Sequence, residues 1–178
     1  FPSSMEEVTS IFELLKKHTI PFTILGNGSN VLVLDKGIRG AVVKFNSPMS
    51  VIRQEGNTII AGAGAMLKDV SQFAADCGLT GLEFAIGIPG SIGGAVFMNA
   101  GAYDGEMKPI VSNVRAVAST GKVISYAQEE LDFGYRHSVF QDNGQAICEV
   151  TVSLQPGDSA AIQEKMDGFT ERRERKQP

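Results

Sequence analysis

The chain has 178 residues, of which 43% are hydrophobic, and a formal net charge of −4. This size and composition fit one soluble globular domain or two small subdomains that share a core. The acidic balance argues against a nucleic-acid-binding protein, because binding to the phosphate backbone needs a basic face. No apolar run reaches the ~20 residues that a membrane-spanning helix requires, so the sequence predicts no membrane segment.

The two cysteines and the two histidines do not gather in the sequence. Cys77 and Cys148 each lie in an apolar pattern, which predicts two reduced thiols in the core and a reducing compartment, the cytoplasm. His18 and His137 have no metal-ligand residues in a suitable pattern around them, so we expect no metal site.

The first part of the chain, residues 1–46, predicts a helix followed by strands. Ser4 and Glu7 fit a capping box, and apolar residues at helical spacing follow until Pro21. The apolar runs after this helix predict short strands at 22–25, 31–34 and 40–45. We expect these elements to form a first subdomain of the β-α-β-β kind.

The second part, residues 47–178, predicts a mixed or antiparallel sheet with helices. Gly56-Asn57 and Thr120-Gly121 are typical hairpin turns between apolar runs. Gly78 fits the left-handed position that ends a helix. The expected elements are hairpins at 51–61 and 114–126, helices at 67–77, 94–98 and 159–175, and a strand at 146–154.

A short glycine-rich loop, Gly26 to Asn30, directly follows the first predicted strand. Its glycines permit positive φ angles, and its Asn and Ser side chains add hydrogen-bonding groups to the backbone N–H groups. The loop could cradle a phosphate, although a tight turn without a ligand has the same composition. Its spacing matches neither the Rossmann fingerprint nor the Walker A loop.

The stretch from Gly81 to Gly105 is more specific. Few Cβ atoms let backbone N–H groups approach anionic oxygens closely. Close packing of backbones alone would also favour glycine, but aliphatic residues such as Ile86, Ile92 and Val96 are interleaved with the small ones. This pattern suits a flat ring on one side and hydrogen-bonding backbone on the other. Two such loops predict a ligand with a phosphate-bearing spine, such as a dinucleotide.

Several segments together carry a family resemblance. They are GLEF at 81–84, GIPGSIGG at 87–94, MNAGAY at 98–103 and FGYRHSVF at 133–140, preceded by the loop at 25–30. In this order, and over nearly the whole chain, they resemble the UDP-N-acetylenolpyruvoylglucosamine reductases, a family of flavoenzymes of peptidoglycan synthesis.

The resemblance implies an α+β fold of the vanillyl-alcohol-oxidase (PCMH) type, in which two subdomains hold FAD noncovalently between them. The residues implied to contact the FAD pyrophosphate are Gly26, Asn27, Gly28, Ser29 and Asn30. The residues implied to line the rest of the cofactor site are Pro89, Gly90, Ser91, Gly93, Gly94, Asn99, Gly101, Ala102 and Ile147.

Arg136 matches the catalytic arginine of the family. The implied reaction is the NADPH-dependent reduction of UDP-N-acetylglucosamine enolpyruvate to UDP-N-acetylmuramate. Hydride addition at C3 of this enol ether leaves negative charge at C2, beside the substrate carboxylate. A fixed guanidinium can pair with that carboxylate and stabilise the charge. Without the resemblance, Arg136 would pass for a surface side chain, and we interpret the adjacent His137 as structural.

The family also uses a serine and a glutamate to deliver the second hydrogen as a proton, and neither motif occurs in this sequence. Ser138 and Glu149 do not match them. We therefore expect the FAD-binding part of a reductase, inactive alone and without the C-terminal substrate domain, with no obligate protein partner evident. The alternative is a stand-alone flavin- or nucleotide-binding module without turnover. An oxidase with covalently linked flavin is disfavoured because His18 and Cys77 lie outside the glycine loops.

Overall fold

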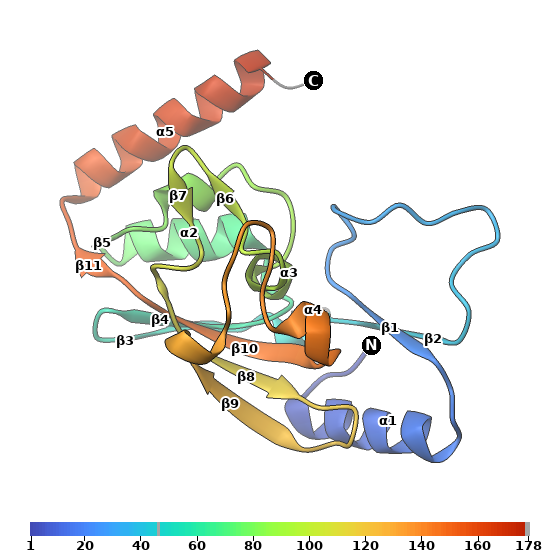
Figure 1. Cartoon of the computed structure of the whole chain (residues 1–178). Coiled ribbons are helices and arrows are strands. Elements are labelled where there is room, and N and C mark those ends of the chain that lie inside the picture. Colours follow the sequence, from blue (N-terminus) through green and yellow to red (C-terminus); the bar gives the residue numbers. More distant parts are fainter. Residues whose placement is uncertain (46, 177–178) are drawn as a thin grey trace.

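The computed structural model of the chain describes residues 1–45 and 47–176. It has an α+β fold in which a five-stranded sheet, in the order β3-β4-β10-β8-β9, lies apart from a two-stranded parallel sheet of β1 and β2 (Figure 1). The small sheet and the helix before it come from residues 1–45, with α1 at Met5–Lys17, β1 at Phe22–Leu25 and β2 at Ala41–Lys44. Asn46, the last residue of the predicted first subdomain, lies outside the described residues.

Helix α1 begins as the sequence predicts. The Ser4 hydroxyl accepts a hydrogen bond from the Glu7 N–H at 3.2 Å. The second half of the predicted capping box is wrong, because the Glu7 carboxylate accepts from the N–H and hydroxyl of Ser3 instead of reaching back to Ser4. The buried face of α1 includes Phe12, whose ring packs on Phe22 of β1 with 4.6 Å between centroids. The helix is thereby attached to the small sheet.

The predicted strand at 31–34 is wrong. β1 pairs directly with β2, with Phe22 opposite Ala41, and residues 31–34 are irregular and exposed. Leu32 and Leu34 are 86% and 74% exposed. An apolar run becomes a strand only where a neighbouring edge offers hydrogen bonds and cover, and none of the described residues supplies that edge here. The described first part is therefore one helix and two parallel strands rather than a β-α-β-β unit.

The described residues of the second part form the large sheet, four α-helices and several short elements. Its sheet strands are β3 (Ile52–Glu55), β4 (Thr58–Gly62), β8 (Val111–Val117), β9 (Val123–Ala127) and β10 (Ala146–Ser153). Its α-helices are α2 (Leu67–Asp76), α3 (Ile92–Phe97), α4 (Phe140–Asn143) and α5 (Ser159–Lys176). Its short elements are η1 (Ser47–Met49), β5 (Leu79–Thr80), η2 (Glu83–Ala85), β6 (Gly101–Ala102), β7 (Gly105–Glu106), η3 (Gln128–Glu130) and β11 (Gln155–Pro156).

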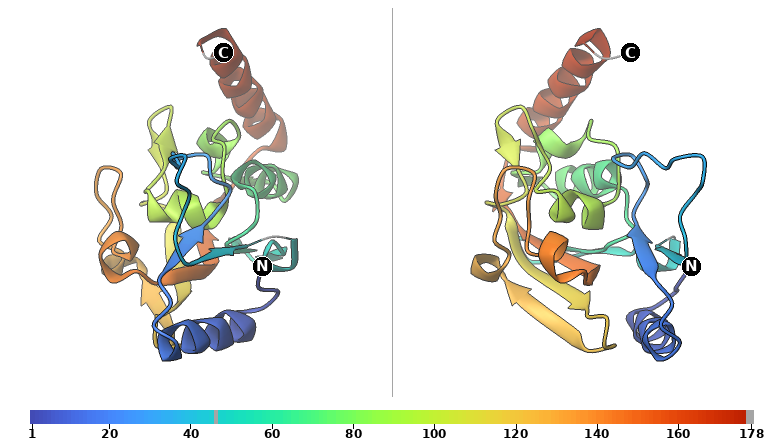
Figure 2. Two further views of the ribbon diagram at one scale, coloured as in Figure 1. Left: turned by 90° about the vertical axis from the view of Figure 1, so that its right-hand side faces the viewer. Right: turned by 45° about the vertical axis from the view of Figure 1, so that its right-hand side comes forward.

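The pairing of the sheet confirms both predicted hairpins. β3 pairs antiparallel with β4, and β8 with β9, while β10 lies between β4 and β8. Gly78 follows α2 with a φ of 67°, as expected for a helix end. α3 begins before the predicted 94–98, because the Ser91 hydroxyl caps it by accepting from the Gly94 N–H at 3.4 Å. α2 and α3 lie on one side of the sheet and α1 on the other (Figures 1 and 2).

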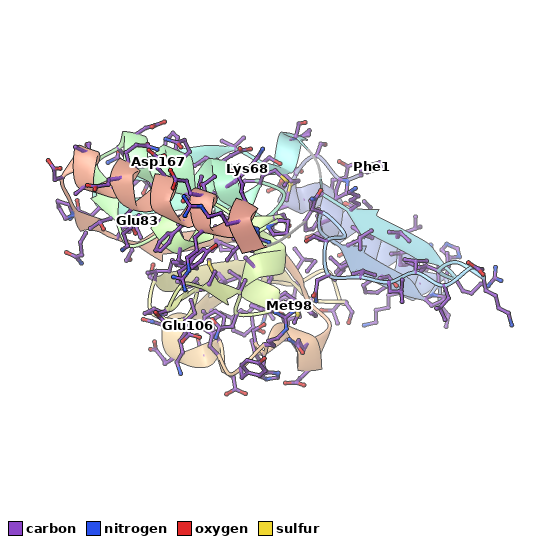
Figure 3. All side chains as sticks on the ribbon, turned by 90° about the horizontal axis from the view of Figure 1, so that it is seen from above. Phe1, Lys68, Glu83, Met98, Glu106 and Asp167 are labelled. Carbon is purple, nitrogen blue, oxygen red and sulfur yellow. The ribbon has the colours of Figure 1, made fainter. Side chains whose placement is uncertain are left out.

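The last helix, α5, covers the outer side of α2 and η2. Ile162 and Met166 of α5 are buried against Ala75 of α2. The Lys165 ammonium lies 3.7 Å from the carboxylate of Glu83, which is only 3% exposed and lies beside α5 (Figure 3). This helix therefore braces the segment that leads into the second glycine loop.

Both cysteines are free thiols. Cys148 is buried in β10, and this burial raises the pKa of its thiol to about 12, so it stays protonated near neutral pH. Cys77 is partly exposed. Among the described helices, none has the length and apolar character needed to cross a membrane.

Candidate functional site

A cavity of about 370 Å³ lies where the two glycine loops meet. Most of the residues that the sequence singles out line it: Gly26, Asn27, Gly28, Ser29, Asn30, Pro89, Gly90, Ser91, Gly93, Gly94, Arg136 and Ile147. They come from the β1–β2 connection, the segment before and within α3, the loop before α4, and strand β10. Segments distant in sequence thus form one continuous wall.

The two loops touch each other directly. The Ser29 hydroxyl donates to the Pro89 carbonyl at 3.0 Å. A Cβ atom on Gly26 would lie 2.8 Å from the Ser91 hydroxyl oxygen, and one on Gly90 would lie 3.0 Å from the Ser29 hydroxyl oxygen. Glycine at these positions permits the close approach, which any larger residue would prevent.

The first loop also offers unpaired backbone donors. Within the described chain, the N–H groups of residues 27–30 donate no hydrogen bond to another residue. Gly28 has a φ of 79°, with open space around its Cβ position. Successive N–H groups in a turn of this kind form a concave site for anionic oxygens, so the loop is chemically suited to a phosphate group.

The second loop is fixed by backbone hydrogen bonds to the segment that joins β4 to α2. The Leu67 N–H donates to the Gly90 carbonyl at 2.9 Å, and the Ile92 N–H donates to the Ala65 carbonyl at 2.8 Å. The Gly93 N–H donates to the Ala63 carbonyl at 3.1 Å, and a Cβ on Gly93 would lie 2.7 Å from the Ala63 Cβ. This side of the cavity therefore has a defined shape without any ligand.

Arg136 lies at the edge of the cavity and is tied to the first loop. Its Nη2 donates to Asn30 Oδ1 at 2.8 Å, and its carbonyl accepts from Gln141 Nε2 at 2.8 Å. Its φ of 52° is uncommon for a residue other than glycine, and such conformations cluster at functional sites. The side chain is exposed and leaves further guanidinium donors free for an anionic ligand.

His137, next to Arg136, does not line the cavity. Its Nε2 lies 3.6 Å from an Asp132 oxygen and 3.4 Å from an Asp142 oxygen. Both carboxylates are largely exposed, so these groups form a solvated cluster outside the candidate site.

Three predicted cofactor residues do not line the cavity: Asn99, Gly101 and Ala102. The Asn99 amide instead links three other segments, since Nδ2 donates to Glu106 Oε2 and to the Gly134 carbonyl, both at 3.0 Å, and Oδ1 accepts from the Lys108 N–H at 2.9 Å. Gly101 and Ala102 form β6 and pair with β7. Their predicted contact with the cofactor remains a prediction.

The residues predicted to hold the cofactor leave out much of the apolar wall. The additional lining residues are Ile24, Leu25, Val31, Phe45, Ala63, Ile88, Ala95, Phe97, Met98, Ala100 and Gln145. Met98 follows directly on α3 (Figure 3). Leu25, Ile88, Met98 and Ala100 lie within the motif segments. Most of the others are ordinary core types, which no motif separates from the rest of the core. Gln145 was detectable, because it lies two positions before Ile147 and alternate residues of an extended segment share a face.

The arrangement fits a dinucleotide with a flat ring system. The free N–H groups of the first loop suit the two phosphates, and the apolar wall suits a ring that needs cover on its face. Arg136 adds a positive charge at the edge, hydrogen-bonded to the loop residue Asn30.

Comparison with known proteins agrees with this chemistry. Residues 1–127 match the model of a family described as FAD binding domain. The chain is 49% identical over 177 residues to the UDP-N-acetylenolpyruvoylglucosamine reductase of Clostridium perfringens, covering 99% of this chain and 58% of that protein. The reductase of the same name from Geobacillus thermodenitrificans is 47% identical, covering 100% of this chain and 58% of the relative. The chain thus spans little more than half the length of these relatives.

Solved structures extend the comparison. The crystal structure of the UDP-N-acetylenolpyruvylglucosamine reductase from Thermus caldophilus has a TM-score of 0.84 and 35% identity, covering 98% of this chain and 61% of that one. Phl p 4, a grass pollen allergen with glucose dehydrogenase activity, has a TM-score of 0.67 at 17% identity, covering 89% and 35%. The latter likeness concerns the fold alone, which is the predicted PCMH-type fold. Because the family model matches residues 1–127, most of its length, the chain belongs to the family of FAD-binding domains.

Proposed function

We propose that the chain is the FAD-binding part of an NADPH-dependent reductase that converts UDP-N-acetylglucosamine enolpyruvate to UDP-N-acetylmuramate in the cytoplasm, a step of peptidoglycan synthesis. The observation that carries this proposal is the position of Arg136. Its guanidinium hydrogen-bonds Asn30 of the first glycine loop and lines the same cavity. The names of relatives that are 47% and 49% identical support this substrate and reaction.

The residues of the cavity would divide the work as follows. The N–H groups of residues 27–30 would hold the FAD pyrophosphate, and the second loop would present its backbone on the opposite side. FAD, when bound, supplies the hydride that it accepts from NADPH. Arg136 would pair with the carboxylate of the enolpyruvate and stabilise the negative charge that develops at C2. The Asn30 amide would hold the guanidinium in place.

The proton for C2 would come from outside residues 1–178. The hydroxyl of Ser138 is fully buried and donates to the Phe97 carbonyl at 2.8 Å, so it is committed to the fold. The Glu149 carboxylate pairs with Arg53 at 3.0 Å and with Arg115 at 3.4 Å, and Glu149 does not line the cavity. Neither residue is placed to act as a general acid, which must reach the atom that it protonates.

The test is Arg136→Ala in the full-length enzyme. We expect turnover to fall by about 100-fold or more, the usual loss when a charge-stabilising donor is removed, while the visible flavin absorbance of the purified protein stays unchanged. Arg115→Ala, on strand β8 and outside the cavity lining, is the matched control and should retain normal turnover. Unchanged turnover in Arg136→Ala would remove this arginine from the mechanism.

A stand-alone flavin-binding module without turnover is the second candidate, because the family model that matches residues 1–127 describes FAD binding alone. Both candidates predict that residues 1–178 bind FAD without reducing the enolpyruvate substrate. They differ in the gene: a coding sequence that continues beyond Pro178 into a substrate domain supports the reductase, and a stop codon at that point supports the module. Substrate turnover by residues 1–178 alone would contradict both.

A further inference from the structure

Gln145 is a polar residue in an otherwise apolar stretch of the cavity wall. It lies between α4 and β10, and its backbone N–H donates to Asn143 Oδ1 at 3.0 Å. Its side chain lines the cavity together with Ile147 of β10. Among the side-chain polar atoms of the described residues, Gln145 Oε1 is buried and has no hydrogen-bond partner.

An unpartnered amide oxygen in such a position is a cost to folding. A buried polar atom without a partner destabilises a protein by about 1–3 kcal/mol, and water does not reach this oxygen, since it is buried. Methionine or leucine would cover the same wall without this cost. No residue of the described chain supplies this oxygen with a hydrogen-bond partner, and the side chain borders the cavity.

We propose that the Gln145 carboxamide is a polar anchor for a heterocyclic ring of bound FAD. The side chain as a whole is only partly buried, and rotation about its terminal bond, which has a broad torsional profile, turns the oxygen toward the cavity. A carboxamide offers one acceptor and one donor side by side. Both rings of FAD carry an N–H donor next to an acceptor on one edge, and Gln pairs with such an edge in the recognition of adenine.

This inference rests on FAD binding by the chain and adds a residue that positions the cofactor. The inference predicts opposite effects of this side chain on two measured properties, the stability of the FAD-free fold and the affinity for FAD. A glutamine with a purely structural role would instead support both. In the protein without FAD, the unpartnered amide oxygen destabilises the fold, so its removal should leave the fold as stable as before or more stable. In the presence of FAD, the amide is a partner, so its removal should weaken binding.

The experiment compares Gln145→Met with the wild type in two measurements on protein freed of FAD. Thermal unfolding without FAD should give a melting temperature at or above that of the wild type. Titration with FAD should give a dissociation constant raised by about tenfold or more, the loss expected for hydrogen bonds made only to the ligand. Gln155→Met, at an exposed glutamine of β11 outside the cavity, is the matched control and should change neither value.

Titrations with FMN and with ADP identify the ring. A weakened FMN complex assigns the anchor to the flavin, and a weakened ADP complex assigns it to the adenine. FAD bound equally well by wild type and Gln145→Met, or a lower melting temperature of Gln145→Met without FAD, would overturn the inference. A wild type that binds no FAD at all would instead refute FAD binding by the chain.

Discussion

The glycine loop before α3 is held by backbone hydrogen bonds, whereas the glycine loop after β1 is held by side chains. On the α3 side, the Leu67 N–H donates to the Gly90 carbonyl of the loop, and the Ile92 N–H donates to the Ala65 carbonyl of the segment that joins β4 to α2. On the β1 side, the connections are the Ser29 hydroxyl to Pro89 and the Arg136 guanidinium to Asn30. One wall of the cavity is part of the core, and the other is attached to it at a few points.

The difference indicates how the site works. A wall fixed by the backbone keeps its shape before a ligand binds, which lowers the ordering cost of binding. A wall held by two side-chain hydrogen bonds can separate and close again, since each such bond contributes only about 1 kcal/mol net. We therefore expect FAD to enter by displacement of the loop at 26–30, with the loop at 86–94 as the fixed side.

Substitution of Gly93 by alanine tests the fixed wall and has the largest expected effect. The added Cβ would lie 2.7 Å from the Ala63 Cβ and 3.0 Å from the Ala63 carbonyl oxygen. Because Ala63 is buried and neither its Cβ nor its carbonyl can move without a shift of the backbone, we expect a loss of about 2–3 kcal/mol in the free energy of unfolding, measured by urea denaturation. Gly168→Ala in α5, where nothing lies within 4 Å of the new Cβ, is the control. It should stabilise by up to about 1 kcal/mol.

Glu83 anchors the segment that leads into the fixed wall. Burial raises the pKa of this carboxyl, but hydrogen bonds from Thr80 and from the Gly81 N–H, together with the charge of Lys165, outweigh burial and leave the pKa below its ordinary value. We expect Glu83→Gln to lose about 1–2 kcal/mol of unfolding free energy at pH 7, because hydrogen bonds to a charged acceptor are stronger than those to an amide.

The same carboxylate gives a pH dependence with a definite sign. Because the pKa of Glu83 is lower in the folded than in the unfolded state, its contribution to stability is complete above the ordinary value of 4.5 and is lost as the pH falls through the folded value. Urea midpoints measured from about pH 6 down to about pH 2 should therefore fall more steeply for the wild type than for Glu83→Gln. Parallel pH profiles would contradict this account.

Gly28→Ala tests the other wall, with a smaller expected cost. Gly28 has a φ of 79° and open space at its Cβ position, so the penalty comes from the backbone conformation, about 1 kcal/mol for an L-residue. We expect FAD binding to weaken by about tenfold, equivalent to 1.4 kcal/mol, because the loop shifts to relieve that strain and its N–H groups lose their alignment. Fluorescence titration with FAD measures this change. Affinity equal to that of the wild type would mean that the loop does not hold the pyrophosphate.

The same contrast explains what the sequence alone could predict. Hairpins at Gly56-Asn57 and Thr120-Gly121 and the helix end at Gly78 depend on local chemistry, and the structure has all three. The predicted strand at 31–34 would have needed the edge of a neighbouring strand to pair with. The residues of the segment itself contain no information about such a neighbour.

The cavity follows the same division. The glycines of the two loops and Arg136 belong to recognisable sequence motifs, so the sequence could single them out. Apolar lining residues such as Phe45 and Ala63 resemble any core residue and became recognisable only through their position in space. Asn99 belongs to a motif but makes its hydrogen bonds with other segments of the fold, so its place in the MNAGAY motif reflects the fold at least as much as the cavity.

Leu32→Ser is the last and smallest test, and it concerns the exposed continuation of the movable wall. Leu32 is 86% exposed, and its neighbours Val31 and Val33 are 52% and 49% exposed. A side chain with so little cover contributes little to folding, so the free energy of unfolding of residues 1–178 should change by less than about 0.5 kcal/mol. Leu67→Ser, at a position with 0% exposure, should by contrast destabilise strongly. If Leu32→Ser costs more than about 1 kcal/mol by urea denaturation, the segment packs against other residues in solution, and the wall at 26–30 is then as firmly held as the wall before α3.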